Sequence, residues 1–389
     1  MTGRRVAVTG LGAISCAGVG VDALWRALME PVAPPSKRIG AFDATHIGGP
    51  KELRRLDPFT LYALMAADEA WGQCGLQGPI TDAGSIVTTG IGGLQTVIEQ
   101  LRVLHEKGPD RVSPFMVPMM MPNAATAAVS MRFGLGGPCE TVTTACAAGT
   151  HAIGNAARLV ATGRSTVAVA GGAEAVMVEI AEAGFRNMTA LSNEDFSRPF
   201  DVARNGFVMG EGSGILILED WEHAVSRGAT ILAEVLGAAS TADAHHITAP
   251  DPSGNGAVRC MELALADAGI EPGEVSHINA HGTSTPLNDL AEAIAVRRVF
   301  GKTPPPVTSI KGHLGHSLAA AGALEGVVSV LTLRNQLIPP TAGTTVVDPE
   351  IGLDVVIGAP RAATVDVVLS NSFGFGGHNG SVVFRRFES

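Results

Sequence analysis

Charged side chains are scarce in this sequence, at 16% of its 389 residues, and aromatic side chains make up only 4%. The formal net charge is -10, whereas a nucleic-acid binder needs clustered Lys and Arg to neutralise phosphates. The sequence also lacks the GxxxxGK[ST] pattern that cradles nucleotide phosphates, and its late glycine-rich turn does not match a dinucleotide fingerprint. These absences argue against a nucleic-acid partner and against a bound nucleotide cofactor.

Cysteine is also rare. There are five cysteines, an odd number, and none has CxxC spacing, so neither a disulfide framework nor a zinc knuckle is expected. A reducing cytoplasm fits this pattern best. Two histidine pairs, His313 with His316 and His245 with His246, raise the alternative of a metal site. No carboxylate or cysteine obviously completes the ligand set, so we predict no metal.

No hydrophobic run is long enough to span a membrane. The first residues, MTGRRVAVTGLGAISCAG, superficially resemble a signal peptide. Gly10, Gly12 and Gly18 interrupt the apolar run, so VAVTGLGAIS is better interpreted as a buried strand that leads into a glycine turn. We therefore expect no membrane partner and a cytoplasmic protein.

Hydrophobic residues, by contrast, make up 46% of the chain, and 48 glycines are dispersed along it. This composition predicts a compact globular protein with many tight turns. Short β-branched runs alternate with alanine-rich stretches, which is typical of an α/β layered fold. Strands are expected in RRVAVTG, GSIVTTG, STVAVAGG and VSHINAHG, and helices over residues 61–72, 149–163 and 257–269.

Two segments of the chain resemble each other. ETVTTACAAGTHAIGNAARLV and VTSIKGHLGHSLAAAGALEGVV each run from an extended stretch through a sharp turn into a helix of small residues. We therefore predict a duplicated architecture, with one half over residues 1–237 and the other over residues 238–389. No Pro/Ser-rich linker separates the halves, so one shared core is expected.

The segment TTACAAGTHAIG places Cys146 between a β-branched strand and a helix of small residues. At a helix N-terminus the macrodipole favours the thiolate, so Cys146 is a candidate nucleophile. The structural alternative is an inert cysteine among packed alanines. That alternative is the expectation for the other four cysteines, which are Cys16, Cys74, Cys139 and Cys260.

Two histidine segments supply candidate acid–base groups. In INAHGTSTPLND, His281 ends an apolar strand, as a catalytic base or donor would. In SIKGHLGHSLAAAGALE, Lys311 and His316 precede a helix that carries Glu325. A buried Lys–Glu pair would fix the neighbouring imidazole. For each histidine the alternative is a hydrogen-bonded core residue.

Near the C-terminus, NSFGFGGHNGS forms a glycine-rich turn that carries two phenylalanines. Gly374 and Gly376 would let the backbone approach a ligand, and Phe373 would lie beside it. Phe375 would cover an apolar channel as a gate. We therefore predict that this turn binds substrate.

These motifs resemble the β-ketoacyl-acyl-carrier-protein synthases of thiolase fold, and in particular the elongating type of fatty acid and polyketide synthesis. The resemblance runs nearly end to end and includes FSRPFDVARNGFVMGEGSG as a further signature. It implies a thiolase-like α/β fold with a duplicated α/β/α/β/α five-layer architecture. It also implies a Cys-His-His triad, an oxyanion hole and an acyl pocket. The triad would be Cys146, His281 and His316, assisted by Lys311 and Glu325. The backbone N–H groups of Cys146 and Phe375 would form the oxyanion hole. Met121 and Phe185 would line the acyl pocket.

The reaction that this resemblance implies is a decarboxylative condensation of an acyl group on Cys146 with a malonyl carrier thioester, without any cofactor. Fatty acid elongation is the preferred pathway, and a specialised type II polyketide pathway is the alternative. A thiolase would need a second cysteine near the C-terminus, and none follows Cys260. A starter-unit synthase would have a Cys-His-Asn set, and a non-catalytic chain-length factor would lack Cys146.

The resemblance also implies partners. Acyl carrier proteins are acidic, and KELRRLD supplies a basic docking patch of Lys51, Arg54 and Arg55, expected on one helical face. Thiolase-fold relatives pair through a strand next to the nucleophile, so we expect a homodimer or a heterodimer with a related subunit. His313 and His378 depart from the residues frequent in the family.

Overall fold

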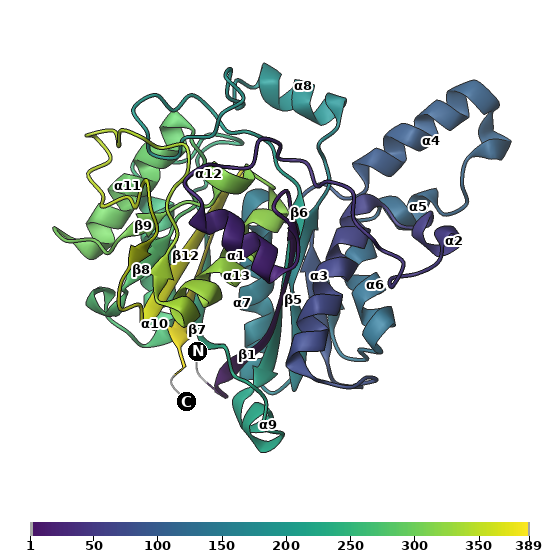
Figure 1. Cartoon of the computed structure of the whole chain (residues 1–389), viewed down its shortest axis with the longest axis horizontal. Helices are drawn as coiled ribbons and strands as arrows, with labels where there is room; N and C mark the ends of the chain where they lie inside the picture. The colour runs from purple at the N-terminus through teal and green to yellow at the C-terminus, as the bar shows by residue number, and fades with distance from the viewer. Residues whose placement is uncertain (1–2, 388–389) are drawn as a thin grey trace.

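A computed structural model of the chain describes residues 3–387. Its centre is one continuous sheet made of two five-stranded parts that share a strand order (Figure 1). The first part has the order β4 (Cys139–Glu140), β3 (Gly84–Thr88), β5 (Val167–Glu174), β6 (Gly212–Asp220), β1 (Val6–Ser15). The second has the order β9 (Val307–Thr308), β8 (His277–Asn279), β12 (Val367–Gly374), β13 (His378–Arg386), β7 (Ala233–Ala242).

The two parts match strand for strand. In each, the outer three strands are parallel and the next two pairings are antiparallel. Short antiparallel pairing between β1 and β7, from Val6↔Val235 to Val8↔Ala233, joins them. The predicted duplication is therefore confirmed. The boundary between the two halves near residue 237 remains a proposal. Gly237 lies within β7, the first strand of the second part.

Helices form three layers around the two parts of the sheet (Figure 1). The outer layer of the first part is α3 (Pro58–Cys74) and α6 (Ala124–Phe133), and that of the second part is α10 (Asn255–Ala268) and α11 (Pro286–Phe300). Between the parts lie α7 (Ala148–Ala161) and α13 (Ala319–Asn335). This is the five-layer α/β/α/β/α arrangement predicted above.

The smaller elements connect these layers or project from them. In Figure 1, α4 projects from the body with α5 and α2 beside it. The helices are α1 (Val21–Met29), α2 (Pro50–Leu53), α4 (Leu94–Lys107), α5 (Met116–Met120), α8 (Glu179–Asn187), α9 (Trp221–Ser226) and α12 (Lys311–Leu314). The 3₁₀ turns are η1 (Pro109–Arg111), η2 (Ala145–Ala147) and η3 (Pro272–Glu274), and the short strands are β2 (Gly18–Val19), β10 (Leu337–Ile338) and β11 (Arg361–Ala362).

Strand alternation distributes the core between the layers. In β5, Ala168 and Ala170 face the central helices, whereas Val167 and Val169 face α3 and α6. The central helices approach closely because small residues line their contact: a Cβ atom on Gly149 of α7 would lie 2.5 Å from the Ala319 carbonyl oxygen. This contact brings the N-terminal ends of α7 and α13 together at the site described below.

The first apolar run behaves as the sequence predicted. VAVTGLGAIS is strand β1, and all ten of its residues are buried. Across residues 3–387, we find no helix with the length and apolar character needed to span a membrane.

Candidate functional site

Cys146 lies in the turn η2, just before α7, and is 5% exposed. Its neighbour Ala145 has φ of +49°, a left-handed conformation that a residue with a Cβ adopts only under constraint. A Cβ atom on Gly374 would lie 2.8 Å from the Thr144 carbonyl oxygen and 3.1 Å from the Cys146 nitrogen. Glycine at 374 therefore allows the C-terminal turn to contact the backbone of the candidate nucleophile.

The electrostatics of Cys146 differ from the sequence-based expectation of a stabilised thiolate. The helix N-terminus is present, but burial raises the pKa of the Cys146 thiol to about 12. The charge of Lys311 and a hydrogen bond from the Phe375 backbone N–H lower this pKa, and buried Glu174 raises it. At neutral pH the thiol is therefore protonated, and it would have to lose its proton to act as a nucleophile.

His281 follows β8, and its backbone is fixed by a buried carboxylate on α11. The N–H groups of His281 and Gly282 donate to the two oxygens of Glu292, each at 2.8 Å. Burial raises the pKa of Glu292 to about 7. This contact fixes the turn and holds the imidazole over the same cavity as Cys146.

Lys311 and Glu325 form a buried ion pair beside His281. The Lys311 ammonium also donates to the His281 carbonyl oxygen at 2.6 Å and lies 3.4 Å from Nδ1 of its ring. An ammonium has only donors, so Nδ1 of His281 is the acceptor and Nε2 carries the hydrogen. Loss of either member of a buried pair typically costs about 3–5 kcal/mol, because the other charge is left unpaired.

His316 lies between α12 and α13. Its backbone N–H donates to the Val208 carbonyl at 2.7 Å, and its ring contacts the edge of the Phe207 ring at a centroid distance of 5.1 Å. The rings of His281 and His316 are 5.4 Å apart at 83°. Burial and the Lys311 charge lower the pKa of both imidazoles well below 6.5, so both are neutral at pH 7.

A cavity of about 350 Å³ joins these groups. Seven of the eleven residues predicted to be catalytic or substrate-binding line it, namely Cys146, Phe185, His281, His316, Phe373, Gly374 and Phe375. Phe185 on α8 lies 6.4 Å from Phe375, centroid to centroid. Gly376 is in the same turn but not in the lining, and Met121 follows α5 with 42% of its surface exposed, away from this cavity. The role of Met121 remains a prediction.

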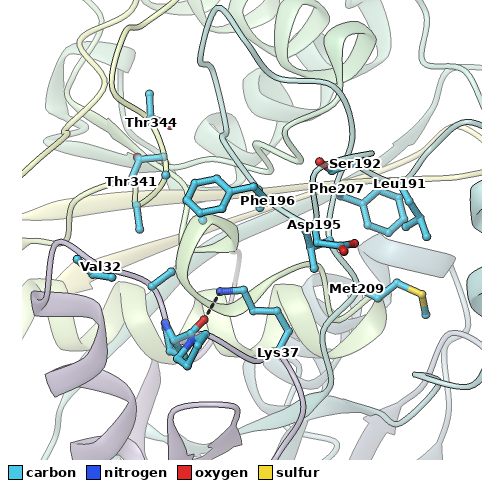
Figure 2. Close-up of a pocket in the computed structure, with 18 of the residues that line it drawn as sticks. Val32, Lys37, Leu191, Ser192, Asp195, Phe196, Phe207, Met209, Thr341 and Thr344 are labelled. Carbon is cyan, nitrogen blue, oxygen red and sulfur yellow. Dashed lines mark hydrogen bonds between the residues drawn. The ribbon is translucent and has the colours of Figure 1, made fainter.

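A second cavity, of about 570 Å³, lies on the other side of Phe207. Figure 2 shows Leu191, Phe207 and Met209 together on one side of it and Val32 and Lys37 on another. Cys146 and the two imidazoles do not line it. Phe207 therefore separates the larger cavity from the one that contains the reactive groups.

The predicted docking residues lie in and just after α2 (Figure 1), and none of them lines the cavity. Lys51, Arg54 and Arg55 are all exposed. The expected shared helical face is only partly present, because α2 ends at Leu53 and Arg54 is already its C-cap. The Arg55 guanidinium instead stacks over the Phe115 ring at 4.2 Å.

The two histidines that depart from the family pattern, His313 and His378, lie in different surroundings. His313 is buried, and its Nε2 lies 2.8 Å from the Glu30 carbonyl oxygen, which makes it a packing contact between α12 and the end of α1. His378 begins β13, with its ring beside Gly376. Within residues 3–387, no three His, Cys, Asp or Glu side chains gather as a metal ion would require.

Sequence reasoning missed several buried polar groups around the site. Glu292 is one; its only signal is a carboxylate eleven residues after His281, in a helix whose buried residues also include Asp289. Ser372 is another: its hydroxyl lies 3.3 Å from Glu325 Oε2 and 2.7 Å from the hydroxyl of Thr150 on α7. These contacts connect the nucleophile helix with the Lys–Glu pair.

Family models match most of the chain. The model described as "Beta-ketoacyl synthase, N-terminal domain" matches residues 32–224, and the one described as "Beta-ketoacyl synthase, C-terminal domain" matches residues 232–345. Among curated proteins, the chain is 44% identical to a 3-oxoacyl-[acyl-carrier-protein] synthase 2 of Synechocystis sp. and 42% identical to one of Rhizobium meliloti. Each similarity covers 99% of this chain and 99% of the relative.

Solved structures are similar over the whole chain as well. A ketosynthase/chain length factor named for ishigamide has a TM-score of 0.93 at 33% identity, covering 100% of both chains. A beta-ketoacyl synthase from Burkholderia phymatum has a TM-score of 0.91 at 33% identity, covering 99% of this chain and 100% of that one. A type II polyketide ketosynthase, solved in complex with its acyl-carrier protein, has a TM-score of 0.91 at 30% identity, with 100% of both chains covered.

Proposed function

The chain belongs to the beta-ketoacyl synthase family, and we propose that it is a 3-oxoacyl-[acyl-carrier-protein] synthase that extends acyl chains by two carbons. The observation that carries this proposal is the convergence of a cysteine at a helix N-terminus and two neutral imidazoles on one cavity. A thiol supplies a nucleophile for thioesters, and imidazole N–H groups supply donors to a developing oxyanion.

In the first half-reaction, Cys146 sulfur attacks the carbonyl carbon of an acyl carrier thioester. The N–H groups of Cys146 and Phe375 would stabilise the oxyanion. The new carbon–sulfur bond replaces the old one, and the Cys146 proton passes to the carrier thiol that leaves. Proton loss during attack agrees with the raised pKa of the free thiol.

In the second half-reaction, malonyl carrier thioester enters the cavity and loses carbon dioxide. The electron pair of the broken carbon–carbon bond forms an enolate, whose oxygen would accept hydrogen bonds from His281 and His316. Lys311 keeps His281 in the tautomer with hydrogen on Nε2. The enolate carbon then attacks the acyl carbonyl, and the Cys146 thiolate leaves and takes up a proton.

Fatty acid elongation is the pathway that the similarities support best. The curated relatives named 3-oxoacyl-[acyl-carrier-protein] synthase 2 are 42–44% identical over the full length, whereas the type II polyketide ketosynthase structure is 30% identical. The five cysteines are unpaired, which agrees with our proposal of a cytoplasmic enzyme.

The proposed function is tested by incubating the protein with an acyl carrier protein loaded with a saturated acyl chain and with malonyl carrier protein. We expect equal amounts of carbon dioxide and a 3-oxoacyl carrier protein two carbons longer, measured by gas release and mass spectrometry. A protein that accepts only poly-3-oxo chains, or that turns over only with a second related subunit, would instead be a polyketide ketosynthase.

We propose that the acyl carrier protein docks on the basic patch formed by Lys51, Arg54 and Arg55. The Arg54→Glu/Arg55→Glu variant should raise KM for carrier-bound substrates, because an acidic partner would meet negative charge. Reaction with a small acyl thioester should stay unchanged. A matched control is Arg259→Glu, which reverses an exposed cation on α10. An equal loss with carrier-bound and small substrates would contradict the docking role.

We also propose that two chains pair, either identical or related. Edge strand β4 has exposed residues and no neighbour on one side within the described chain, as an edge available for pairing would. Figure 1 shows α4 and α5 projecting from the body of the molecule, and exposed apolar residues lie on α4 and on or beside α5, namely Leu101, Leu104, Phe115, Val117 and Met121. If a second chain covers this surface, Met121 would border an acyl pocket shared between the chains.

A further inference from the structure

His151 is a buried imidazole on α7, five residues after Cys146, that the mechanism above does not use. It is 7% exposed, and both of its ring nitrogens have partners. Nε2 lies 3.0 Å from the Asn379 carbonyl oxygen and Nδ1 lies 2.7 Å from the Thr144 hydroxyl. A carbonyl only accepts, so Nε2 carries the hydrogen and Nδ1 accepts from Thr144.

This arrangement requires the neutral ring. Burial lowers the pKa of His151, and the charges that His378 and Arg158 present to it lower the pKa further. The ring packs against β13 at Gly380, where a Cβ atom would lie 3.0 Å from the imidazole, so glycine leaves the space that the ring occupies. His151 therefore has one tautomer and two hydrogen bonds.

The two partners of His151 belong to the two segments that carry the oxyanion donors. Thr144 lies two residues before Cys146, and Asn379 is paired with Phe373 at the base of the turn that carries Phe375. The segments touch at Gly374, whose Cβ position is 2.8 Å from the Thr144 carbonyl oxygen. The His151 imidazole thus bonds to both segments, the one with Thr144 and the one with Asn379. The contact between these segments sets the spacing of the Cys146 and Phe375 N–H groups.

Backbone strain adds to the need for such a bridge. Ala145, between Thr144 and Cys146, has φ of +49°, a left-handed conformation that persists only where the surroundings fix it. The Thr144 hydroxyl bond to His151 is a side-chain contact that anchors this strained turn to α7.

We propose that His151 is a positioning residue that holds the Thr144–Cys146 segment and the Phe375 turn at the spacing required by the oxyanion hole. It does not line the cavity and acts only through these two segments. The inference rests on the proposed function, because it concerns the acyl-transfer half of that reaction. Decarboxylation uses His281 and His316 instead and should not depend on His151.

The test compares the two half-reactions in His151→Phe, which keeps a ring and removes both hydrogen bonds. Acylation of Cys146 by an acyl carrier protein should slow by about 10–100-fold, less than the ~100–1000-fold typical of deleting an oxyanion donor. Carbon dioxide release from malonyl carrier protein should stay within about threefold of wild type, since that reaction relies on other donors. His151→Gln, which keeps a side-chain donor and an acceptor, should restore part of the acylation rate.

Two further variants separate positioning from stability. His277→Phe alters another buried histidine, whose ring nitrogens have no hydrogen-bond partner among residues 3–387, and should change neither half-reaction. Thr144→Val should slow acylation, and the double variant with His151→Phe should be no slower than His151→Phe alone, because Thr144→Val removes a bond that His151→Phe has already removed. Equal losses of acylation and decarboxylation in His151→Phe, or additive losses in the double variant, would overturn the inference. If the wild type itself fails to condense, the proposed function fails; normal acylation by His151→Phe in a protein that condenses refutes the positioning role alone.

Discussion

Replacing Cys146 with alanine should abolish acyl transfer and condensation while decarboxylation of malonyl carrier protein continues. The substitution removes the only thiol that lines the catalytic cavity among residues 3–387, so no covalent acyl-enzyme can form. The two imidazoles remain 5.4 Å apart, and both stay neutral donors to an enolate. The acyl-enzyme is measured by its mass shift, and decarboxylation by carbon dioxide release in the absence of acyl donor.

Cys260→Ala is the matched control, since it removes another buried thiol. Cys260 is fully buried in the core between α10 and the second part of the sheet, 3.5 Å from the Ala239 carbonyl oxygen. The Cys260→Ala variant should be acylated on Cys146 and should condense like wild type. A thiol-reactive acyl mimic such as cerulenin should add once to wild type and not to Cys146→Ala. An unmodified wild type would favour a binding protein of the chain-length type over an enzyme.

The layered, duplicated fold was predictable because its signals are local. Strand β1 and helices α3, α7 and α10 each have a short composition pattern that matches their secondary structure. The duplication was visible because one supersecondary unit, a strand, a sharp turn and a helix of small residues, occurs twice, as β4–η2–α7 and β9–α12–α13. Both units have to present a reactive group at a helix start, so both retain the same small residues where α7 meets α13.

The sequence predicted which residues lie in the site better than it predicted the electrostatics of Cys146. A helix N-terminus is readable from sequence, and it favours a thiolate at Cys146. Burial of Cys146 opposes it, and that burial depends on packing against segments distant in the sequence, such as those of Phe207 and Leu318, which no local pattern contains. Glu292 and Ser372 were missed for a related reason. Each acts through a contact with another segment of the chain, and neither has a motif of its own.

The docking patch shows the limit of spacing arguments in short elements. Lys51, Arg54 and Arg55 have helical spacing, but the helix ends at Leu53, so the last two arginines leave the helical face. Arg55 then stacks on Phe115, whose position depends on α5. Met121 likewise follows α5 on a surface that the described chain leaves exposed, so its environment depends on what covers that surface.

His281→Ala and His316→Ala should each accept an acyl group on Cys146 yet lose condensation by ~100–1000-fold, the effect typical of removing one oxyanion donor. The physical reason is that the enolate forms in a buried site, where no water replaces the missing N–H. His281→Ala should also disturb Lys311, whose ammonium would lose Nδ1 as a partner while keeping Glu325 and the carbonyl of residue 281. Single-turnover mass spectrometry measures acylation, and carbon dioxide release measures decarboxylation.

His313→Ala is the matched control for His316→Ala, because it removes a buried imidazole from the same short segment. The His313 ring bonds to the Glu30 carbonyl and not to the cavity, so its loss should lower thermal stability without a selective loss of decarboxylation. The two catalytic variants should differ from it by losing carbon dioxide release while keeping acylation. If His281→Ala and His316→Ala condensed at near wild-type rate, the enolate would have to be stabilised by other donors, and membership of the family would no longer explain the chemistry of this chain.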